Sequence, residues 1–466
     1  MSATRIEHDL LGERDIPADA YWGIHTLRAL ENFPITGKPI GSYPDLVRAL
    51  ALVKQAAALA NRDLGELDGA HAEAIVAACK EIAGGALHDQ FVVDVIQGGA
   101  GTSTNMNANE VICNRALELL GAARGDYVTL HPINHVNMSH STNDVSPTAL
   151  CVAACFAIRE LLDAMAELRL AFSAKANEFR DILKLGRTQL QDAVPMTLGQ
   201  EFATYAIMLG EDEARLGEAI SLIREINLGA TAIGTGINTD IRYTRLAVQY
   251  LVDLSGLPLV SAENLVEATQ DTGAFVQLSG VLKRVACKLS KTCNDLRLLS
   301  SGPQAGFNEI RLPPRAAGSS IMPGKVNPII PEVVNQIAFE VIGNDITIAM
   351  ASEGGQLQLN AFEPIIAHSL FKSIQHLAAG CRTLSRNCVA GITANEDLLA
   401  ERVRTSAGLA TALNPHIGYE NATRVAQEAL RTGRGVAELV LEMGLMDKDA
   451  LDDALRVETL TAPRGK

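Results

Sequence analysis

The chain has 466 residues, of which 47% are hydrophobic and 20% are charged. This composition supplies enough apolar side chains for a large core and is typical of a globular protein rather than a disordered one. The formal net charge of -14 at pH 7 disfavours nucleic acids and anionic membrane surfaces as partners, because their phosphates repel it. An anionic ligand would therefore need a locally positive site.

The amino terminus and the cysteines indicate a cytoplasmic protein. Residues 1–14 contain acidic and basic side chains and no apolar run of signal-peptide length. An apolar stretch of about 18 residues, as a membrane helix requires, is not found further along. The eight cysteines include no CxxC pair and are expected to be reduced thiols in the core. Cys151 and Cys155 stand one helical turn apart, and packing explains them better than a metal site does.

Proline placement predicts long helices. Proline interrupts helix interiors, and the gaps between Pro147, Pro195, Pro258 and Pro303 each leave room for a long helix. In all three gaps apolar residues recur at steps of three and four, for example over residues 150–172. Strand signals are limited to short candidates near the amino terminus and around residues 182–185. The predicted class is therefore mainly α.

Two further apolar segments, at about 329–352 and 362–392, would complete a five-helix bundle. We expect this long central helical bundle to be flanked by two smaller domains. Several of its helices carry apolar residues on more than one face, as at residues 153–156, which predicts an oligomer. The predicted domains are an amino-terminal domain at 1–140, the central bundle at 141–395 and a small carboxy-terminal helical domain at 396–466.

Four polar loops next to helix ends are candidates for chemistry, and the first two precede helices. Residues 97–105 contain three glycines before a helix expected from about Met106, and the N–H groups and hydroxyls of such a helix start suit a carboxylate. A glycine-rich turn with a Ser or Thr cap is the simpler explanation of this loop taken alone. Residues 131–147 place more hydroxyls before a long helix than capping requires. Their three histidines lack a convincing carboxylate partner, so no metal is expected there.

The third polar loop gives weaker evidence of a functional site than the fourth. Residues 186–195 connect two long helices, and an ordinary helix–helix turn explains them equally well. Residues 317–328 contain glycines and prolines that would permit a mobile lid. Within this last loop Lys325 supplies the positive charge that an anionic substrate requires, and Asn327 adds a directional donor.

The segment GSSIMPGKVNP, residues 318–328, matches the signature loop of the aspartase and fumarase superfamily. The resemblance also covers the other three loops and residues 17–28, so it spans essentially the whole chain. It implies a central helical bundle, four copies of which assemble with dihedral symmetry as a homotetramer. It also implies that each active site takes loops from three subunits.

The resemblance further implies which residues form the site, with Ser319 as the catalytic base. The remaining residues would bind substrate, and no metal or cofactor is expected. They are Thr188, Lys325 and Asn327 on one carboxylate, Thr102, Ser141 and Thr142 on the other, and Asn143 near the amino group.

Within the superfamily, GGAGTSTNMN, MSHSTND and GRTQLQDAVPMTLGQEF resemble the aspartase branch, which eliminates ammonia reversibly from L-aspartate to give fumarate. Fumarate hydratases typically have a Thr-His pair where this chain has Thr188 and Gln189. Gln189 cannot exchange a proton at neutral pH, although it can orient an ammonium group. Ile133 stands where many relatives have a polar residue, so the secondary dicarboxylate site of fumarases is not expected. A fumarate hydratase and a lyase for N-substituted aspartates are the alternatives.

Overall fold

The structure is a computed structural model that describes residues 3–318, 321–322 and 324–463. It is mainly helical, as the sequence predicts, and the described strands form two-stranded sheets. The chain divides into two compact units: unit 1 is Met1–Leu162, Ala214–Ala286 and Phe339–Leu377, and unit 2 is Asp163–Glu213, Cys287–Ala338 and Ala378–Lys466. The domain boundaries near residues 140 and 395 stay a prediction.

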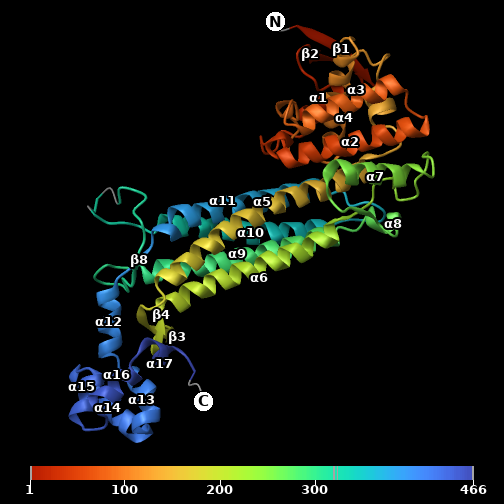
Figure 1. Cartoon of the computed structure of the whole chain (residues 1–466). Helices are drawn as coiled ribbons and strands as arrows, with labels where there is room; N and C mark the ends of the chain where they lie inside the picture. The colour runs from red at the N-terminus through yellow and green to blue at the C-terminus, as the bar shows by residue number, and fades with distance from the viewer. Residues whose placement is uncertain (1–2, 319–320, 323, 464–466) are drawn as a thin grey trace. The chain divides into compact units, whose positions relative to one another are not determined.

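Five long helices contribute residues to both units (Figure 1). They are α5 (Thr142–Glu178), α6 (Leu198–Ile223), α9 (Gly273–Leu299), α10 (Ile329–Glu353) and α11 (Glu363–Asn387). These bounds confirm the helices predicted from the proline gaps and the apolar spacing. In α5 the residues that recur at steps of three and four, including Leu150, Leu161 and Phe172, are buried, because they form the apolar stripe of an amphipathic helix.

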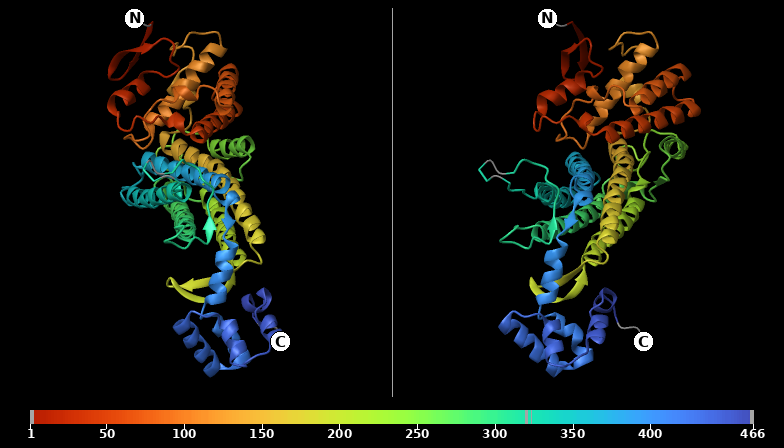
Figure 2. Two further views of the ribbon diagram at one scale, coloured as in Figure 1. Left: turned by 90° about the vertical axis from the view of Figure 1, so that its left-hand side faces the viewer. Right: turned by 60° about the vertical axis from the view of Figure 1, so that its left-hand side comes forward.

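Polar contacts join these helices within each unit. In unit 1, Ser279 and Lys283 of α9 donate to the carboxylate of Asp345 in α10 at 2.8 and 2.5 Å. In unit 2, Arg386 of α11 donates two hydrogen bonds of 2.7 Å to Glu167 of α5. The helix segments of each unit therefore pack side by side, as the three views show (Figures 1 and 2).

The amino-terminal elements of unit 1 pack around a buried carboxylate. Glu110 accepts hydrogen bonds from the backbone N–H groups of Gly23, His25 and Thr26, which satisfies the start of α1. Apart from the long helices, the helices and strands of unit 1 are β1 (Thr4–Asp9), β2 (Gly12–Pro17), α1 (Ile24–Asn32), α2 (Pro44–Leu64), α3 (Gly69–Ala83), α4 (Thr102–Leu119), β5 (Glu225–Ile226), α7 (Tyr243–Ser255), β6 (Val260–Ser261) and α8 (Leu265–Ala268). Strands β1 and β2 pair antiparallel, and β5 and β6 pair parallel.

The carboxy-terminal part of unit 2 has its own core. Leu185 packs there with Val403, Leu413 and Val425, and Figure 2 shows the β3–β4 hairpin beside these helices. The elements are β3 (Leu183–Thr188), β4 (Gln191–Thr197), β7 (Ile310–Arg311), β8 (Thr393–Ala394), α12 (Glu396–Thr405), α13 (Leu409–Ile417), α14 (Tyr419–Thr432), α15 (Val436–Glu442), α16 (Lys448–Ala454) and α17 (Val457–Thr461). The strand predicted around residues 182–185 is confirmed, and the polar connection at 186–195 belongs to a hairpin.

Two helix starts lie earlier than the sequence suggests. Helix α4 begins at Thr102 rather than near Met106, because the side-chain oxygen of Gln97 accepts the N–H of Thr104 and so caps the first turn. Helix α5 begins at Thr142 and includes Pro147. In the part of the chain that the structure describes, no helix is long and apolar enough to cross a membrane.

Candidate active site

The glycine-rich loop of unit 1 turns sharply before α4. Gly99, Ala100 and Gly101 all have positive φ angles, of 90°, 54° and 89°, so the chain enters α4 through three successive left-handed residues. Gly101 also needs to lack a side chain, because a Cβ there would lie 2.5 Å from the Oγ of Ser146 in α5. The loop is thereby held against the first turns of α5. Thr102, the first residue of α4, is exposed and donates its hydroxyl to the Gly99 carbonyl at 2.7 Å.

The hydroxyls at the start of α5 are oriented by the protein. The Oγ1 of Thr142 accepts a hydrogen bond of 3.0 Å from the Nδ2 of Asn105, and the Oγ of Ser141 accepts the N–H of Asn143 at 3.3 Å. Each oxygen therefore acts as an acceptor toward the protein, and its own proton is available to a ligand. A carboxylate at this helix start would also be stabilised by the helix dipole.

Asp144 fixes the backbone of this helix start. Its carboxylate accepts the N–H groups of Ser141, Gly229 and Thr231 at 2.8, 2.9 and 3.2 Å. Burial raises the pKa of Asp144 to about 6, although these backbone bonds oppose the shift. Asn143 is held by its side chain, whose Nδ2 donates to the Ala232 carbonyl at 2.7 Å. The amide oxygen of Asn143 can then accept a bond from a ligand amine.

A buried network of hydrogen bonds reaches Thr142 through Asn105. The Nζ of Lys54 lies 2.8 Å from the Oδ1 of Asn137 and 2.7 Å from the Nε2 of His140. The same Asn137 oxygen accepts a bond of 3.1 Å from Asn105, which in turn donates to Thr142. Burial lowers the pKa values of both Lys54 and His140, so this region carries less positive charge than its composition suggests.

Sequence reasoning missed Lys54, Asn105 and Asn137. A lysine within the apolar run of residues 49–60 was a usable signal, since lysine is rarely fully buried without a partner. Asn105 lies within the predicted glycine-rich loop, but its role depends on Thr142, which is 37 residues away. A hydrogen bond between residues so far apart in the chain leaves no local sequence pattern.

In unit 2, Thr188 and Gln189 lie at the tip of the β3–β4 hairpin. Thr188 pairs with Gln191, and Gln189 and Leu190 between them have φ angles of 53° and 63°. Two central residues with positive φ form the turn that best matches the twist of a hairpin. Both Thr188 and Gln189 are exposed in the single chain.

A buried ion cluster anchors the base of this hairpin. Glu309 is buried, and its carboxylate lies 2.9 Å from the Nζ of Lys184, 2.5 Å from Arg187 and 3.2 Å from Arg402. Burial alone would raise the pKa of Glu309, but the bonds from Arg187 and Lys184 outweigh it and lower that pKa. The guanidinium of Arg187 also stacks 4.4 Å from the ring centroid of Phe307. The hairpin tip is thus fixed through its base.

Gly318 and Lys325 of the fourth polar loop approach each other closely in unit 2. A Cβ on Gly318, whose φ is 87°, would lie 2.1 Å from the Lys325 carbonyl oxygen. Lys325 and Asn327 line a cavity of about 680 Å³ together with Arg297 and Arg311. Among the described residues, the lining includes the cations Lys325, Arg297 and Arg311 and no carboxylate, which suits an anionic ligand. Ser319 lies outside the described residues.

The structure therefore brings the predicted residues together in groups. The first group comprises Thr102, Ser141, Thr142 and Asn143, around the starts of α4 and α5 in unit 1. The second comprises Lys325 and Asn327 at the cavity of unit 2, whose lining does not include Thr188 or Gln189 of the hairpin tip.

Comparisons with known proteins show the family of the chain. A family model described as lyase matches residues 12–343, and one described as fumarase C C-terminus matches residues 409–462. The aspartate ammonia-lyase of Pseudomonas fluorescens is 60% identical over 99% of this chain and 96% of that relative. The aspartate ammonia-lyase of Escherichia coli strain K12 is 53% identical over 99% and 97%.

Solved structures agree as well. The fumarate lyase:delta crystallin from Brucella melitensis bound to cobalt has a TM-score of 0.96 and 55% identity, covering 99% of this chain and all of that one. The recombinant class II fumarase from Schistosoma mansoni has a TM-score of 0.91 and 34% identity, covering 98% of each chain. The chain therefore belongs to the aspartase and fumarase superfamily of lyases.

Proposed function

We propose that this protein is an aspartate ammonia-lyase, which eliminates ammonia reversibly from L-aspartate to give fumarate. Identity of 60% to a curated aspartate ammonia-lyase over nearly the full length supports this assignment. The observation in the structure that carries it is the pair of hydroxyls at the start of α5. Ser141 and Thr142 accept bonds from the protein and keep their own protons for a carboxylate.

These hydroxyls act where negative charge develops. Removing a proton from the carbon beside a carboxylate produces a carbanion, which delocalises into that carboxylate as a doubly negative aci-carboxylate. Thr102, Ser141 and Thr142 would hold this group, with the positive end of the α5 dipole behind it. The Thr102 hydroxyl turns from the Gly99 carbonyl toward the substrate to take part. Losing one such donor typically costs about 10²- to 10³-fold in rate.

The second carboxylate and the amino group have separate partners. Lys325 and Asn327, at the cavity lined by cations, bind the other carboxylate together with Thr188. The amino group lies near Asn143, whose amide oxygen is free to accept because its Nδ2 donates to the Ala232 carbonyl. Gln189 adds a second amide that orients the ammonium group without exchanging a proton.

Ser319 is the proposed base, and it requires the charge of Lys325 and the exclusion of water to exist as an alkoxide. Its Oγ takes the proton from the carbon beside the aci-carboxylate. The electron pair of that C–H bond enters the carboxylate. The pair then returns to form the C=C bond as the C–N bond breaks, and nitrogen leaves with the electrons of that bond. The products are fumarate and ammonia, and no cofactor takes part.

We also propose a homotetramer with active sites shared between subunits. Apolar side chains are exposed along the long helices of the single chain, and such a surface is normally covered by a partner. They include Ile207, Leu222, Phe339, Ile346 and Met350. Loops supplied by different subunits would complete a site from the separate residue groups. A cytoplasmic location is supported by the eight free cysteines.

The decisive experiment measures fumarate by its ultraviolet absorbance when the purified protein meets L-aspartate, with L-malate in parallel. Fumarate from aspartate alone is the expected result. Fumarate from malate alone would instead make the protein a fumarate hydratase. Ser319→Ala should abolish the elimination and leave the oligomer size unchanged by gel filtration, and substantial activity in this variant would refute the assignment of the base.

A further inference from the structure

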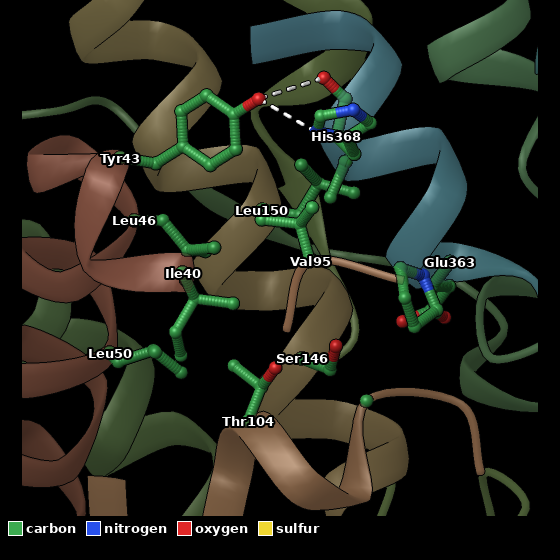
Figure 3. A pocket seen from close by; sticks show the side chains of 13 residues that line it. Ile40, Tyr43, Leu46, Leu50, Val95, Thr104, Ser146, Leu150, Glu363 and His368 are labelled. Carbon is green, nitrogen blue, oxygen red and sulfur yellow. Dashed lines mark hydrogen bonds between the residues drawn. The ribbon is translucent and has the colours of Figure 1, made fainter. Parts of the chain in front are cut away.

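The small cavity beside the first turns of α5 has no room for a substrate (Figure 3). Its volume is about 30 Å³, which admits one water molecule. Figure 3 shows Tyr43 and His368 at one end of it and Thr104 and Ser146 at the other, and most of the remaining lining is apolar. Recognition of the substrate amino group therefore depends on side chains outside this cavity. Among the proposed site residues of unit 1, that group is assigned to Asn143.

The amide group of Asn143 can face its neighbour in only one sense. It lies against the backbone carbonyl of Ala232, and its Nδ2 donates to that oxygen at 2.7 Å. A carbonyl only accepts hydrogen bonds, so the reverse orientation would bring two acceptor oxygens together. The Oδ1 of Asn143 is therefore directed away from Ala232, as an acceptor that suits a donor such as an ammonium group. The position of the Ala232 carbonyl thus decides what Asn143 can bind.

Asp144 holds the loop that carries this carbonyl. Its Oδ2 accepts the N–H groups of Gly229 and Thr231 at 2.9 and 3.2 Å, and Thr231 directly precedes Ala232. The φ angle of Thr231 is 56°, a left-handed conformation that a β-branched residue rarely adopts. The side chain of Thr231 is also buried, and its Oγ1 has no hydrogen-bond partner among the described residues. Such strain persists only where the surrounding structure imposes it, and it is concentrated at functional sites.

Two glycines bring the loop close to neighbouring helices. A Cβ on Gly229, whose φ is 95°, would lie 2.1 Å from the Oγ1 of Thr244 in α7. A Cβ on Gly234, whose φ is 99°, would lie 2.3 Å from the backbone nitrogen of Val266 in α8. Because a backbone atom cannot turn aside as a side chain can, the contact at Gly234 is the stricter one. Residues 229–234 are therefore fixed by Asp144 of α5 and by close packing on α7 and α8.

We propose that the 229–234 loop is a positioning element for substrate specificity, which directs the Asn143 amide so that the site selects a ligand with an amino group. This role rests on the proposed function, in which Asn143 binds the amino group of L-aspartate. The loop acts through the Ala232 carbonyl and does not contact the substrate. If that carbonyl is displaced, the amide can rotate, and its Nδ2 can then face the ammonium group and repel it. The two substrate carboxylates are bound by other residues and keep their partners.

The test compares L-aspartate with succinate, which has the same two carboxylates and no amino group. The variant is Gly234→Ala, whose added methyl group meets the backbone of Val266 and displaces the loop. The kcat/KM for L-aspartate should fall at least about tenfold, as expected for loss of a hydrogen bond to a charged group. The inhibition constant of succinate against L-aspartate should equal that of the wild type. A merely structural disturbance of the site would weaken both ligands together.

Gly236→Ala is the matched control. Gly236 also has a positive φ angle, of 64°, but a Cβ there would meet no atom closer than 3.5 Å. The substitution adds left-handed strain and can lower the melting temperature, whereas kcat/KM and the succinate inhibition constant should equal those of the wild type. A fall in kcat/KM as large as that of Gly234→Ala would assign the effect to backbone strain and refute the proposed role.

A double variant tests whether the loop acts through Asn143. In the Asn143→Ala protein there is no amide to direct, so adding Gly234→Ala should cause no further fall in kcat/KM for L-aspartate. A further fall as large as the one that Gly234→Ala causes in the wild type would show that the two positions act independently. That result would refute the proposed coupling.

Ala232→Gly decides the question if Gly234→Ala yields no folded protein. Ala232 is exposed, and glycine keeps the carbonyl while adding backbone freedom. The kcat/KM for L-aspartate should fall about two- to fivefold, with the succinate inhibition constant unchanged. An unchanged kcat/KM in either folded variant, or a parallel loss of succinate binding, would refute the role of the loop alone. Absence of fumarate formation from L-aspartate by the wild type would refute the proposed function instead.

Discussion

The Nδ2 of Asn227 donates a hydrogen bond of 3.1 Å to the backbone carbonyl of Asn143. In a regular helix this carbonyl would accept the N–H four residues later, but that residue is Pro147, which has none. Asn227 thus replaces the missing helical bond. It allows α5 to begin at Thr142, and the hydroxyls of the proposed site to stand at a helix start.

Asn227→Ala should therefore destabilise the protein and disturb the site. The partly buried carbonyl of Asn143 would lose its partner, at a cost of up to about 1–3 kcal/mol. The melting temperature should fall at fixed protein concentration, and kcat/KM for L-aspartate should fall with it. Asn421→Ala is the control, because the Nδ2 of Asn421 donates a bond of 2.9 Å to the carbonyl of Ile417 at the end of α13, before α14, whose start no proline interrupts. Equal melting temperatures for the two variants would contradict the role of Asn227.

Asn105→Asp tests whether Thr142 donates to the substrate. A carboxylate at this position would accept the Thr142 hydroxyl instead of donating to it, so the proton would no longer be available. Loss of one hydrogen bond to a charged group costs about 1.5–3 kcal/mol, and KM should rise at least about tenfold.

Asn109→Asp is a closely matched control for this variant. Asn109 also donates to the Oδ1 of Asn137 at 3.1 Å, so the change places the same charge beside the same partner. Asn109 lies one helical turn beyond Asn105 and has no bond to Thr142 among the described contacts. A similar rise in KM for both variants would mean that charge alone, and not the direction of the Thr142 hydroxyl, determines binding.

Glu309→Gln should destabilise the base of the hairpin that carries Thr188. Three cations would lose their shared buried carboxylate, and breaking a buried ion pair typically costs about 3–5 kcal/mol. The melting temperature at pH 7 should fall well below that of the wild type. Glu201→Gln should have a smaller effect, because Lys184 then keeps Glu309 as a partner.

The ion pairs of Glu309 also predict that its contribution to stability depends on pH. The pKa of Glu309 is lowered in the folded protein, so its stabilisation is present above the unfolded value of about 4.3 and is lost as the pH falls below it. The difference in melting temperature between wild type and Glu309→Gln should therefore shrink from pH 5 toward pH 3. A difference that stayed constant over this range would show that Glu309 is not stabilised by its ion pairs.

The sequence predicts most of the fold because helix periodicity is a local property. Steps of three and four between apolar residues located three of the long helices, apolar content located the other two, and the glycine-rich loop and the hydroxyl cluster were correctly placed next to helix starts. The residue at which α5 begins was not predicted, because Pro147 lies inside the helix and the missing helical bond is replaced by Asn227, 80 residues away. The role of Lys54 was missed for a related reason, because Lys54 lies within a helical pattern and its partners come from a distant segment.

Lys325→Ala tests the second carboxylate site. Lys325 lines the cavity with Arg297 and Arg311, and its ammonium group would contact the substrate carboxylate directly. Removing a charged hydrogen bond of about 1.5–3 kcal/mol should lower kcat/KM for L-aspartate about 10- to 150-fold, mainly through KM.

Lys291→Ala is the control. It removes an exposed lysine of α9 that pairs with Asp295 one turn away, and its kinetics should equal those of the wild type. An unchanged KM in Lys325→Ala would place the second carboxylate elsewhere. A fall in kcat should accompany the rise in KM, because the proposed mechanism also assigns the charge of Lys325 to the alkoxide of Ser319.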